Sequence, residues 1–523
     1  MSDGASESLS VPLEMLRRTL LYACLATQLL GCTLGANILA LMGMTSPSNH
    51  IWNSVLLHEL ATRGHNLTIL SVDVPRPNEQ VPDNVTYIHL ERAYDMYKQR
   101  GEGGSNESIT SFIGLGGFES IRPFYKFGLE TARHIAKSNG MQQLLNYPDD
   151  FHFDLIVNDY TMGPYLLGFV HKFRYPPILG MSAFHNPPIT MDFMSNTYLP
   201  ALTPFHSTSY SPQMNFFQRL HNTLIFAADT IYRRWHYNPA LDEIMRPHFG
   251  DDMPPLDKLA KRTLISLVNS HPAIDYAEAL PPSIIEVGGM QIRKANPLSP
   301  ELETFVREGR QGAVLFSLGT NMQPRDVDKQ TVRIIVEAFR QLPEYNFLWK
   351  FDAEYLREIR MPKNVLVSNF LPQRDILAHD ALRAFVSHCG GLSSQEATWH
   401  GVPLVGIPLF LDQHRNLRQS LNADVAVQVD YLSMTTQDLI YAIKEATENE
   451  QIAAAMQARS ARFRDNPITP LKLAVWWVEY LLRQPEPHHL QSPAKDMNYF
   501  EAHSLDVLAL LLFIIWRIYE KFR

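Results

Sequence analysis

Cysteine, basic charge and paired metal ligands are scarce in this sequence of 523 residues. Three cysteines are too few for a disulfide scaffold. The net charge of -8 gives no basic excess of the kind that binds nucleic acid, so no nucleic-acid partner is expected. The one adjacent histidine pair, His488-His489, lies in a polar stretch with Pro485 and Pro487. We interpret this stretch as a solvated linker and expect no metal site.

A long apolar run is also missing near the C-terminus. Residues 505–519 are mainly apolar, but the uninterrupted part, Val507–Trp516, is shorter than the ~20 residues that a membrane span needs. The basic residues that follow, including those of the tail 520–523, are typical of a cytosolic end. We expect a membrane anchor at 505–519 that contacts lipid, after a tail linker at 485–504. A short interfacial helix is the alternative.

The N-terminus has the pattern of a secretory signal over residues 1–36. Arg17-Arg18 supplies the positive region, Thr19–Leu30 the apolar core, and small residues near Gly35 a cleavage site. An uncleaved anchor is the alternative, because the polar lead before Arg17 is long. Sequons agree with a lumenal body and begin at Asn66, Asn84 and Asn106. The expected location is therefore the endoplasmic reticulum membrane, with lumenal domains and a short cytosolic tail.

Between these ends the chain alternates apolar strands with amphipathic helices. This alternation predicts α/β domains with doubly wound parallel sheets. Residues 37–287 form the first domain, residues 288–311 a polar linker with Pro297 and Pro300, and residues 312–484 the second domain. The first domain contains many aromatic and Met residues between Ile109 and Tyr232. Their excess in loop-like stretches favours an apolar acceptor pocket or a membrane-facing surface.

One stretch, Phe385 to Gln413, carries the clearest chemistry. A buried strand ends at Val386, and a turn containing Gly390 leads into a helix start. The next strand ends just before Asp412-Gln413. Free backbone N–H groups and the positive end of a helix favour an anion, and ligands of open α/β sheets bind beyond the carboxyl ends of the strands. The stretch therefore predicts a nucleotide or phosphate site.

The residues of this stretch resemble the signature of the UDP-dependent glycosyltransferases, in particular the animal branch and its arthropod members. The matching positions are His388, Cys389-Gly390, Ser393, Glu396, Gly401, Pro403, Pro408, Asp412 and Gln413, preceded by Phe370-Leu371-Pro372-Gln373. The resemblance implies two Rossmann-like domains that face a cleft, the GT-B architecture. It also implies metal-independent, inverting transfer of a hexose, glucose rather than glucuronate, from a UDP-sugar to a small lipophilic acceptor, as in detoxification.

The resemblance assigns the donor to the second domain. Phe370 takes the place of a uracil-stacking aromatic residue. Gln373 is expected to reach the uridine edge or the ribose. Glu396 accepts hydrogen bonds from the ribose hydroxyls, because a carboxylate is an acceptor only. Ser393 and the helix N-terminus take the α-phosphate, and His388 the β-phosphate.

Further donor contacts are implied around the sugar and the phosphates. Asp412 and Gln413 are expected to bind sugar hydroxyls. Ser317, Gly319 and Thr320 form a second turn of small residues close to the phosphates. Without a metal, the charge of the leaving group would be stabilised by the helix end, the N–H groups and His388.

The catalytic base is the position where the sequence departs from the family pattern. Asp159 matches the family's orienting carboxylate, but the position of the family's base is occupied by Asn49, with His50 next to it. Three interpretations remain: His50 replaces the base through a one-residue shift, the acceptor is an amine or thiol that needs little base, or the protein binds without turnover. We favour the shift to His50. The alternative function is a catalytically impaired protein that binds a UDP-sugar or a hydrophobic ligand, and homo-oligomerisation stays open.

Overall fold

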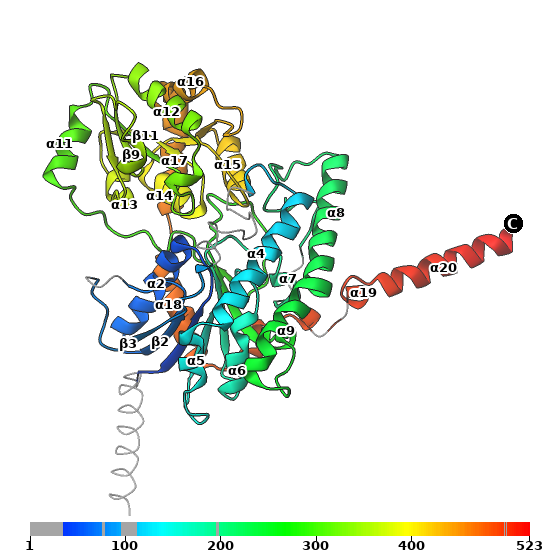
Figure 1. The fold of residues 1–523 in the computed structure, drawn as a ribbon. Helices are drawn as coiled ribbons and strands as arrows, with labels where there is room; N and C mark the ends of the chain where they lie inside the picture. The colour runs from blue at the N-terminus through cyan, green and yellow to red at the C-terminus, as the bar shows by residue number, and fades with distance from the viewer. Residues whose placement is uncertain (1–34, 76–78, 96–111, 195–197, 496, 498) are drawn as a thin grey trace, which may run out of the picture.

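The computed structural model describes residues 35–75, 79–95, 112–194, 198–495, 497 and 499–523. The predicted leader therefore lies outside the described residues, except for its last two positions. The described chain forms two parallel sheets, each packed between helical layers (Figure 1). This confirms the α/β fold with two Rossmann-like domains that the alternating sequence pattern predicts.

The N-terminal domain is built on a seven-stranded sheet with the order β3-β2-β1-β4-β5-β6-β7. Leu39 and Leu41 of β1 face one apolar layer and Ile38 and Ala40 the other, because successive side chains of a strand point to opposite faces. The strands are β1 Asn37–Met42, β2 Asn66–Ser71, β3 Val85–His89, β4 Leu155–Asp159, β5 Ile178–Ser182, β6 Thr263–Val268 and β7 Ile284–Glu286.

The helices of this domain cover both faces of its sheet. The two long helices of this domain, α4 and α8, pack against each other. A π-helical segment, η4 Arg233–Tyr237, joins α8 to α9. The helices are α2 Pro47–Thr62, α4 Phe118–Ala136, α5 Asn139–Leu145, η3 Tyr165–Leu167, α6 Gly168–Lys172, α7 Thr190–Phe193, α8 Phe216–Tyr232, α9 Asn238–Phe249 and α10 Leu256–Ala260.

The C-terminal domain has a six-stranded parallel sheet with the order β10-β9-β8-β11-β12-β13. Its strands are β8 Ala313–Ser317, β9 Asn346–Lys350, β10 Val365–Ser368, β11 Leu382–Ser387, β12 Leu404–Gly406 and β13 Ala426–Gln428. Its helices are α11 Pro300–Glu308, η5 Pro324–Asp326, α12 Lys329–Gln341, η6 Ala353–Leu356, α13 Gln373–Leu377, α14 Gly391–His400, α15 Gln413–Asn422, α16 Thr436–Glu448 and α17 Glu450–Arg464.

After α17 the chain returns to the N-terminal domain. The sequence analysis places residues 312–484 in one domain, but α18 (Pro470–Arg483) packs against α2 of the other domain (Figure 1). Val475 and Val478 are buried in the same apolar cluster as Trp52. The apolar face of α18 therefore completes the N-terminal core, and the two domains are connected twice.

The last elements are η7 His488–Leu490, η8 Pro493–Lys495, α19 Tyr499–Ala502 and α20 Leu505–Phe522. Helix α20 projects away from both domains (Figure 1), and its apolar side chains are exposed. Among the described residues, no helix combines the length and the apolar character that crossing a bilayer requires.

The carboxyl ends of the two sheets face each other across a cleft of about 770 Å³. Asn49 lines it just beyond β1, Met162 beyond β4 and Phe184 beyond β5. His388 beyond β11 and Asp412 beyond β12 line the opposite wall. This is the position at which open α/β sheets bind ligands.

Candidate active site

The turn between β11 and α14 places a half-buried imidazole, His388, at the base of the cleft. Its backbone turns through Cys389, which has φ 61°, and Gly390 then caps α14. The ring of His388 fills the space that a side chain would need on both neighbouring glycines. A Cβ on Gly319 would lie 2.6 Å from the ring, and one on Gly390 2.4 Å from Nε2. The two predicted glycines of the donor site are therefore required by the packing of His388.

His388 is neutral and shares its surroundings with a lysine. Burial, with a smaller contribution from Lys350, lowers the pKa of His388 to about 4. Lys350 ends β9, lines the cleft and donates from Nζ to the carbonyl oxygen of Gly319 at 3.1 Å. Burial also lowers the pKa of this lysine. A half-buried lysine, a neutral imidazole and the N-terminus of α14 converge here, an arrangement suited to a diphosphate.

The residues predicted to hold the nucleoside are already joined by hydrogen bonds. Gln373, the first residue of α13, donates from Nε2 to Glu396 Oε2 at 2.7 Å and to Ser393 Oγ at 3.2 Å. Burial raises the pKa of Glu396, and the Gln373 amide opposes that shift. Phe370 lies at the mouth of the cleft with 66% of its surface exposed, which leaves its ring face accessible for stacking on a base.

The turn after β12 presents a carboxylate and an amide to the same cleft. Asp412 Oδ2 accepts from Asn416 Nδ2 at 2.8 Å. Burial raises the pKa of Asp412 to about 6, against the opposing effect of that hydrogen bond. Gln413 Oε1 accepts from the backbone N–H of Leu409 at 2.8 Å, so its carbonyl is used by the turn and its amide nitrogen is left for a ligand. Ser317 and Thr320 complete the predicted set near Gly319: Ser317 Oγ accepts from Gly319 N, and Thr320 lines the cleft.

On the acceptor wall, Asp159 is buried at the end of β4. Its Oδ2 accepts from Asn53 Nδ2 at 2.9 Å, and its Oδ1 accepts from the Thr161 N–H at 3.0 Å. Burial raises the pKa of Asp159, and the amide of Asn49 is among the neighbours that lower it. The contact with Asn49 is a loose one, because Asn49 Nδ2 makes no hydrogen bond of good geometry to any described residue. Asn49 thus lines the cleft, and the buried Asp159 lies behind it.

The predicted shift to His50 is contradicted by the structure. Helix α2 already begins at Pro47, and the backbone N–H of His50 donates to the carbonyl oxygen of Ser46. Successive residues of a helix point about 100° apart, so Asn49 and His50 cannot face the same side. The His50 ring instead lies 6.3 Å from the ring of Tyr87, and Asp73 is the charged group with the strongest effect on its pKa. His50 is absent from the lining of the cleft.

Apart from Thr45, Ser46 and Ser48 beside Asn49, the rest of the acceptor wall is apolar. Met44 and Phe184 line both the cleft and a side cavity of about 70 Å³ that also contacts His185, His206 and Leu411. More aromatic side chains reach the cleft from the N-terminal domain, namely Phe112, Phe124 and Phe127. The predicted apolar acceptor pocket therefore corresponds to a wall of aromatic and Met side chains opposite the donor residues.

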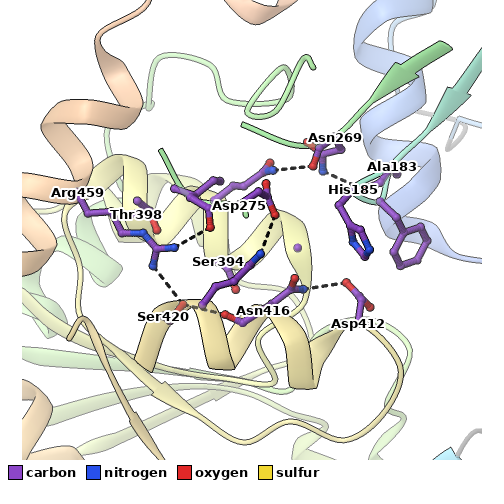
Figure 2. A pocket seen from close by; sticks show the side chains of 15 residues that line it. Ala183, His185, Asn269, Asp275, Ser394, Thr398, Asp412, Asn416, Ser420 and Arg459 are labelled. Atoms are coloured by element: carbon purple, nitrogen blue, oxygen red, sulfur yellow. Dashed lines mark hydrogen bonds between the residues drawn. The ribbon is translucent and has the colours of Figure 1, made fainter. Parts of the chain in front are cut away.

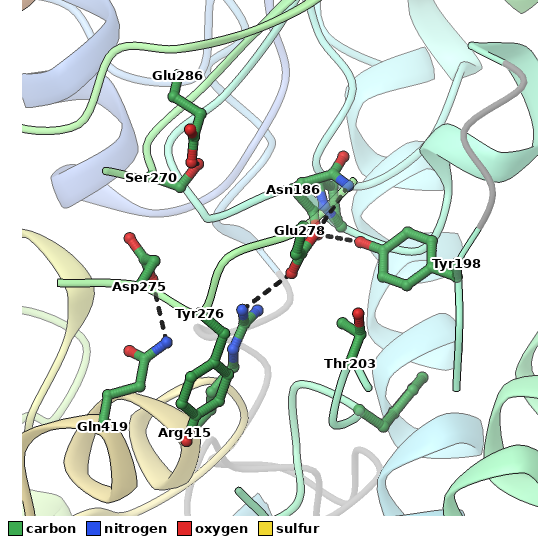
Figure 3. A network of polar contacts seen from close by, with 12 residues as sticks. Asn186, Tyr198, Thr203, Ser270, Asp275, Tyr276, Glu278, Glu286, Arg415 and Gln419 are labelled. Atoms are coloured by element: carbon green, nitrogen blue, oxygen red, sulfur yellow. Dashed lines mark hydrogen bonds and ion pairs between the residues drawn. The ribbon is translucent and has the colours of Figure 1, made fainter. Parts of the chain in front are cut away.

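Polar contacts hold the two walls in register. Arg415 of α15 is almost fully buried and donates from Nη2 to Glu278 Oε1 of the N-terminal domain at 3.1 Å (Figure 3). The same glutamate accepts from Asn186 Nδ2 at 3.2 Å. Gln419 donates to Asp275 at 3.2 Å. In α14, Gln395 Oε1 accepts from the N–H of Gly289, where the chain leaves the N-terminal domain. These contacts fix the distance between the donor and acceptor halves.

Comparison with known proteins decides the family. A family model described as "UDP-glucoronosyl and UDP-glucosyl transferase" matches residues 184–520. UDP-glucosyltransferase 2 of Dactylopius coccus is 31% identical over 503 residues, which cover 94% of this chain and 93% of that protein. This chain belongs to the UDP-glycosyltransferase family. UDP-glucuronosyltransferase 1A1 of Homo sapiens is 27% identical over 488 residues, with coverage of 89% and 86%. The chain is accordingly a UDP-dependent glycosyltransferase.

Solved structures agree on the fold of this enzyme. CalG4, the calicheamicin glycosyltransferase, aligns with a TM-score of 0.56 at 16% identity and covers 86% of this chain and 99% of its own. Phytolacca americana UGT2, complexed with UDP-2fluoro-glucose and pterostilbene, aligns with a TM-score of 0.53 at 14% identity, with coverage of 86% and 100%. The two-domain architecture is thus the GT-B fold of glycosyltransferases.

Sequence reasoning missed several residues of the glycosyltransferase site. The position of Lys350 could have indicated its role, because it stands at the carboxyl end of a strand, where ligands of parallel sheets bind. Asn53, which holds Asp159, and Asn416, which holds Asp412, each follow a recognised residue by one helical turn. In the described ranges, no cluster of three His, Cys, Asp or Glu side chains is placed to hold a metal ion.

Proposed function

We propose that the enzyme transfers a neutral hexose, glucose rather than glucuronate, from its UDP-sugar to a small lipophilic acceptor. The supporting observation is how charge is distributed along the cleft. Its lysine and arginine, Lys350 and Arg374, lie with the nucleotide-side residues, whereas the predicted sugar side presents Asp412 and Gln413. A carboxylate at the sugar would face Asp412, and the nearby Arg415 is already paired with Glu278. A neutral sugar with several hydroxyls suits the Asp412 carboxylate, which accepts hydrogen bonds, and the Gln413 amide nitrogen, which donates them.

The reaction follows from the two walls of the cleft. The acceptor atom attacks the anomeric carbon on the face opposite to UDP, and the bond from that carbon to the β-phosphate oxygen breaks, so the anomeric configuration inverts. Negative charge then grows on the diphosphate. The N-terminus of α14, His388 and the half-buried Lys350 are arranged to stabilise it without a metal ion. Glu396 and Gln373 hold the nucleoside, while Asp412 and Gln413 orient the sugar.

The acceptor class is supported by the aromatic and Met lining of the opposite wall. Flat or lipophilic molecules bury apolar surface against Phe112, Phe124 and Phe127 at roughly 25 cal/mol per Å². A hydroxyl acceptor must lose a proton as it reacts, and Asn49 cannot accept one near neutral pH. An amine acceptor needs less help, so both acceptor classes belong in the test.

The deciding experiment offers UDP-glucose, UDP-glucuronate and UDP-N-acetylglucosamine to the full-length enzyme with phenol, alcohol and amine acceptors. We expect transfer from UDP-glucose, with product formed equally well in EDTA. Preference for UDP-glucuronate would refute the proposed donor. UDP binding without transfer to any acceptor would instead support the second candidate, a binding protein, which the Asn49 substitution favours.

We further propose that the catalytic body is lumenal in the endoplasmic reticulum and that α20 contacts membrane lipid. The support is the exposed apolar surface of α20, where Leu512 and Ile515 are each more than 60% exposed. Its basic residue Lys521 and the terminal Arg523 follow the apolar part. Carbonate extraction of membrane fractions should leave the full chain in the pellet, and a chain truncated before residue 505 should be released. Release of both forms would refute lipid contact through α20.

A further inference from the structure

The acceptor wall contains an imidazole that no part of the proposed donor chemistry uses. His185 follows β5 by three residues and lines the side cavity of about 70 Å³ together with Phe184 and Asp412. It also lines a smaller polar cavity of about 30 Å³ that Asp412 shares. Figure 2 shows His185 extending from the N-terminal domain toward the side on which Asp412 and Asn416 lie. The imidazole therefore lies on the acceptor side of the predicted sugar position.

The backbone around His185 is held more firmly than a surface loop requires. Asn269 donates from its N–H to the carbonyl oxygens of Ser182 and Phe184 at 3.1 and 2.9 Å, and from Nδ2 to that of Ala183 at 2.9 Å. On the other side, Asn186 accepts from Thr190 Oγ1 at 2.8 Å and donates to Glu278. The segment 182–186 is thus fixed by Asn269, which follows β6, by Thr190 of α7 and by Glu278 of the interdomain contact.

The side chain of His185 has no such partners. It makes no hydrogen bond to any residue that the structure describes, whereas the carbonyl oxygens of Ala183 and Phe184 before it both accept from Asn269. Burial, assisted by Arg415 and His206, lowers the pKa of His185 well below its usual range, so the ring is neutral and keeps a free lone pair. A fixed backbone with a neutral, unbonded imidazole beside a cavity leaves a ring nitrogen available to accept a proton, and the lowered pKa makes that nitrogen a weaker base than an exposed imidazole.

The side cavity that His185 lines is close to Asp159 and Asn49, the position at which the family's base is missing. Strands β4 and β5 are neighbours, with Asp159 paired to Met181 in the sheet. The Thr161 N–H donates to Asp159, and Thr161 Oγ1 lies 3.3 Å from Ser182 Oγ, at the start of the His185 segment. Asp159 and the His185 segment thus lie at the same edge of the sheet, and a chain of polar contacts through Thr161 and Ser182 connects them. The side cavity and the main cleft also share lining residues, including Met44 and Met162.

We propose that His185 is the general base of this enzyme and accepts the proton that Asn49 cannot. The inference rests on the proposed transfer to hydroxyl acceptors. As the acceptor oxygen bonds to the anomeric carbon and UDP leaves with the electron pair of the broken bond, the hydroxyl proton passes to a ring nitrogen of His185. The imidazolium then releases it to solvent.

His206 is the competing imidazole, since it lines the same side cavity. Its ring contacts that of Phe205 in a tilted arrangement, with ring centroids 4.2 Å apart, and lies 6.2 Å from the ring of Phe124. Its Nδ1 is buried without a partner among the described residues, and it does not line the polar cavity next to Asp412. We therefore assign the proton to His185 and use His206 as the rival in the experiment.

The test compares His185→Gln, His206→Gln and the control His58→Gln in the full-length enzyme with UDP-glucose as donor. His58 is hydrogen-bonded to Tyr87 at 2.9 Å and lies outside the cleft lining. Each variant receives a simple phenol and an acidic nitrophenol that is largely ionised at the assay pH. We expect His185→Gln to lower kcat for the simple phenol by ~10²–10⁴-fold. The nitrophenol rate should fall far less, because that acceptor has already lost its proton.

Adding Asn49→His to His185→Gln provides a second measurement, because it places an imidazole beside Asp159. We expect partial recovery with the simple phenol. An equal loss for both phenols, or a selective loss in His206→Gln instead, would overturn the assignment to His185. UDP affinity, measured by calorimetry, should be unchanged in His185→Gln. If the unmodified enzyme binds UDP yet transfers to no acceptor, the proposed function has failed, not the assignment alone.

Discussion

The two walls of the cleft differ in how completely their chemistry is in place. On the donor wall, every residue predicted to bind the donor except the buried Ser317 lines the cleft, and Gln373, Ser393 and Glu396 are already joined by hydrogen bonds. On the acceptor wall, the orienting Asp159 is present while its partner is an amide, Asn49. Donor binding and proton removal are thus separable in this molecule, and each can be altered without the other.

The first prediction concerns the contact that joins the walls. Replacing Glu278 by Ala leaves the buried Arg415 without its counter-charge, which should cost about 3–5 kcal/mol in the free energy of unfolding. Denaturant unfolding measures this loss. The double variant Glu278→Leu, Arg415→Met removes both charges and should recover most of it. Equal destabilisation by the single and the double variant would show that packing, and not the ion pair, holds the walls together.

The second prediction tests the donor wall in the transition state. His388→Ala removes a neutral imidazole from the diphosphate site, so kcat with UDP-glucose should fall by ~10²–10³-fold, the typical loss for one donor to a developing negative charge. His388→Gln keeps an N–H donor and should lose less. Because the pKa of His388 is about 4, the rate should not depend on its protonation between pH 6 and 8. Similar rates in the Ala variant and the unmodified enzyme would remove His388 from the mechanism.

The contrast between the walls also explains what the sequence could predict. The donor signature lies within one strand-turn-helix-strand unit, so local spacing fixes its geometry, and His388, Ser393 and Glu396 line the cleft as predicted. The strands were equally readable, since strands buried on both faces appear as continuous apolar runs. The residue beside Asp159 could not be predicted in this way, because it depends on where α2 begins. A start at Pro47 turns His50 outward and leaves Asn49, the position that matches the family pattern, beside Asp159.

Long-range packing accounts for the other misses. Helix α18 follows the second domain in sequence, and only its contact with α2 reveals that its apolar face belongs to the first core. His185 lies in a loop without a periodic pattern, and its position depends on Asn269, more than 80 residues away in the chain. Neither relation leaves a local trace in the sequence.

The third prediction returns to the nucleoside on the donor wall. Glu396→Ala removes the acceptor expected for the ribose hydroxyls and leaves the Gln373 amide without its carboxylate partner. UDP affinity in calorimetry should weaken by about 1–3 kcal/mol, the usual cost of orphaned polar groups. Glu396→Gln keeps one acceptor oxygen and should lose less. Unchanged UDP affinity in the Ala variant would contradict the ribose assignment.

The last prediction separates sugar recognition from nucleotide recognition by pH. Asp412 must be ionised to accept hydrogen bonds from two sugar hydroxyls, and burial raises its pKa to about 6. Donor affinity should therefore fall as the pH drops below 6, by about tenfold between pH 7 and pH 5. UDP without the sugar should weaken less over the same range, because Glu396 contributes equally to both ligands.

Stability should respond to Asp412 with the opposite sign. A carboxyl whose pKa is raised on folding binds more protons in the folded state, so stability decreases as the pH rises from about 4 to 6. Weaker donor binding at pH 5 then cannot be ascribed to unfolding caused by this group. Asp412→Asn should weaken UDP-glucose at pH 7 and abolish the extra pH dependence of UDP-glucose over UDP. Parallel pH profiles for UDP-glucose and UDP in the unmodified enzyme would show that Asp412 does not bind the sugar. The proposal of a neutral hexose would then lose its supporting observation.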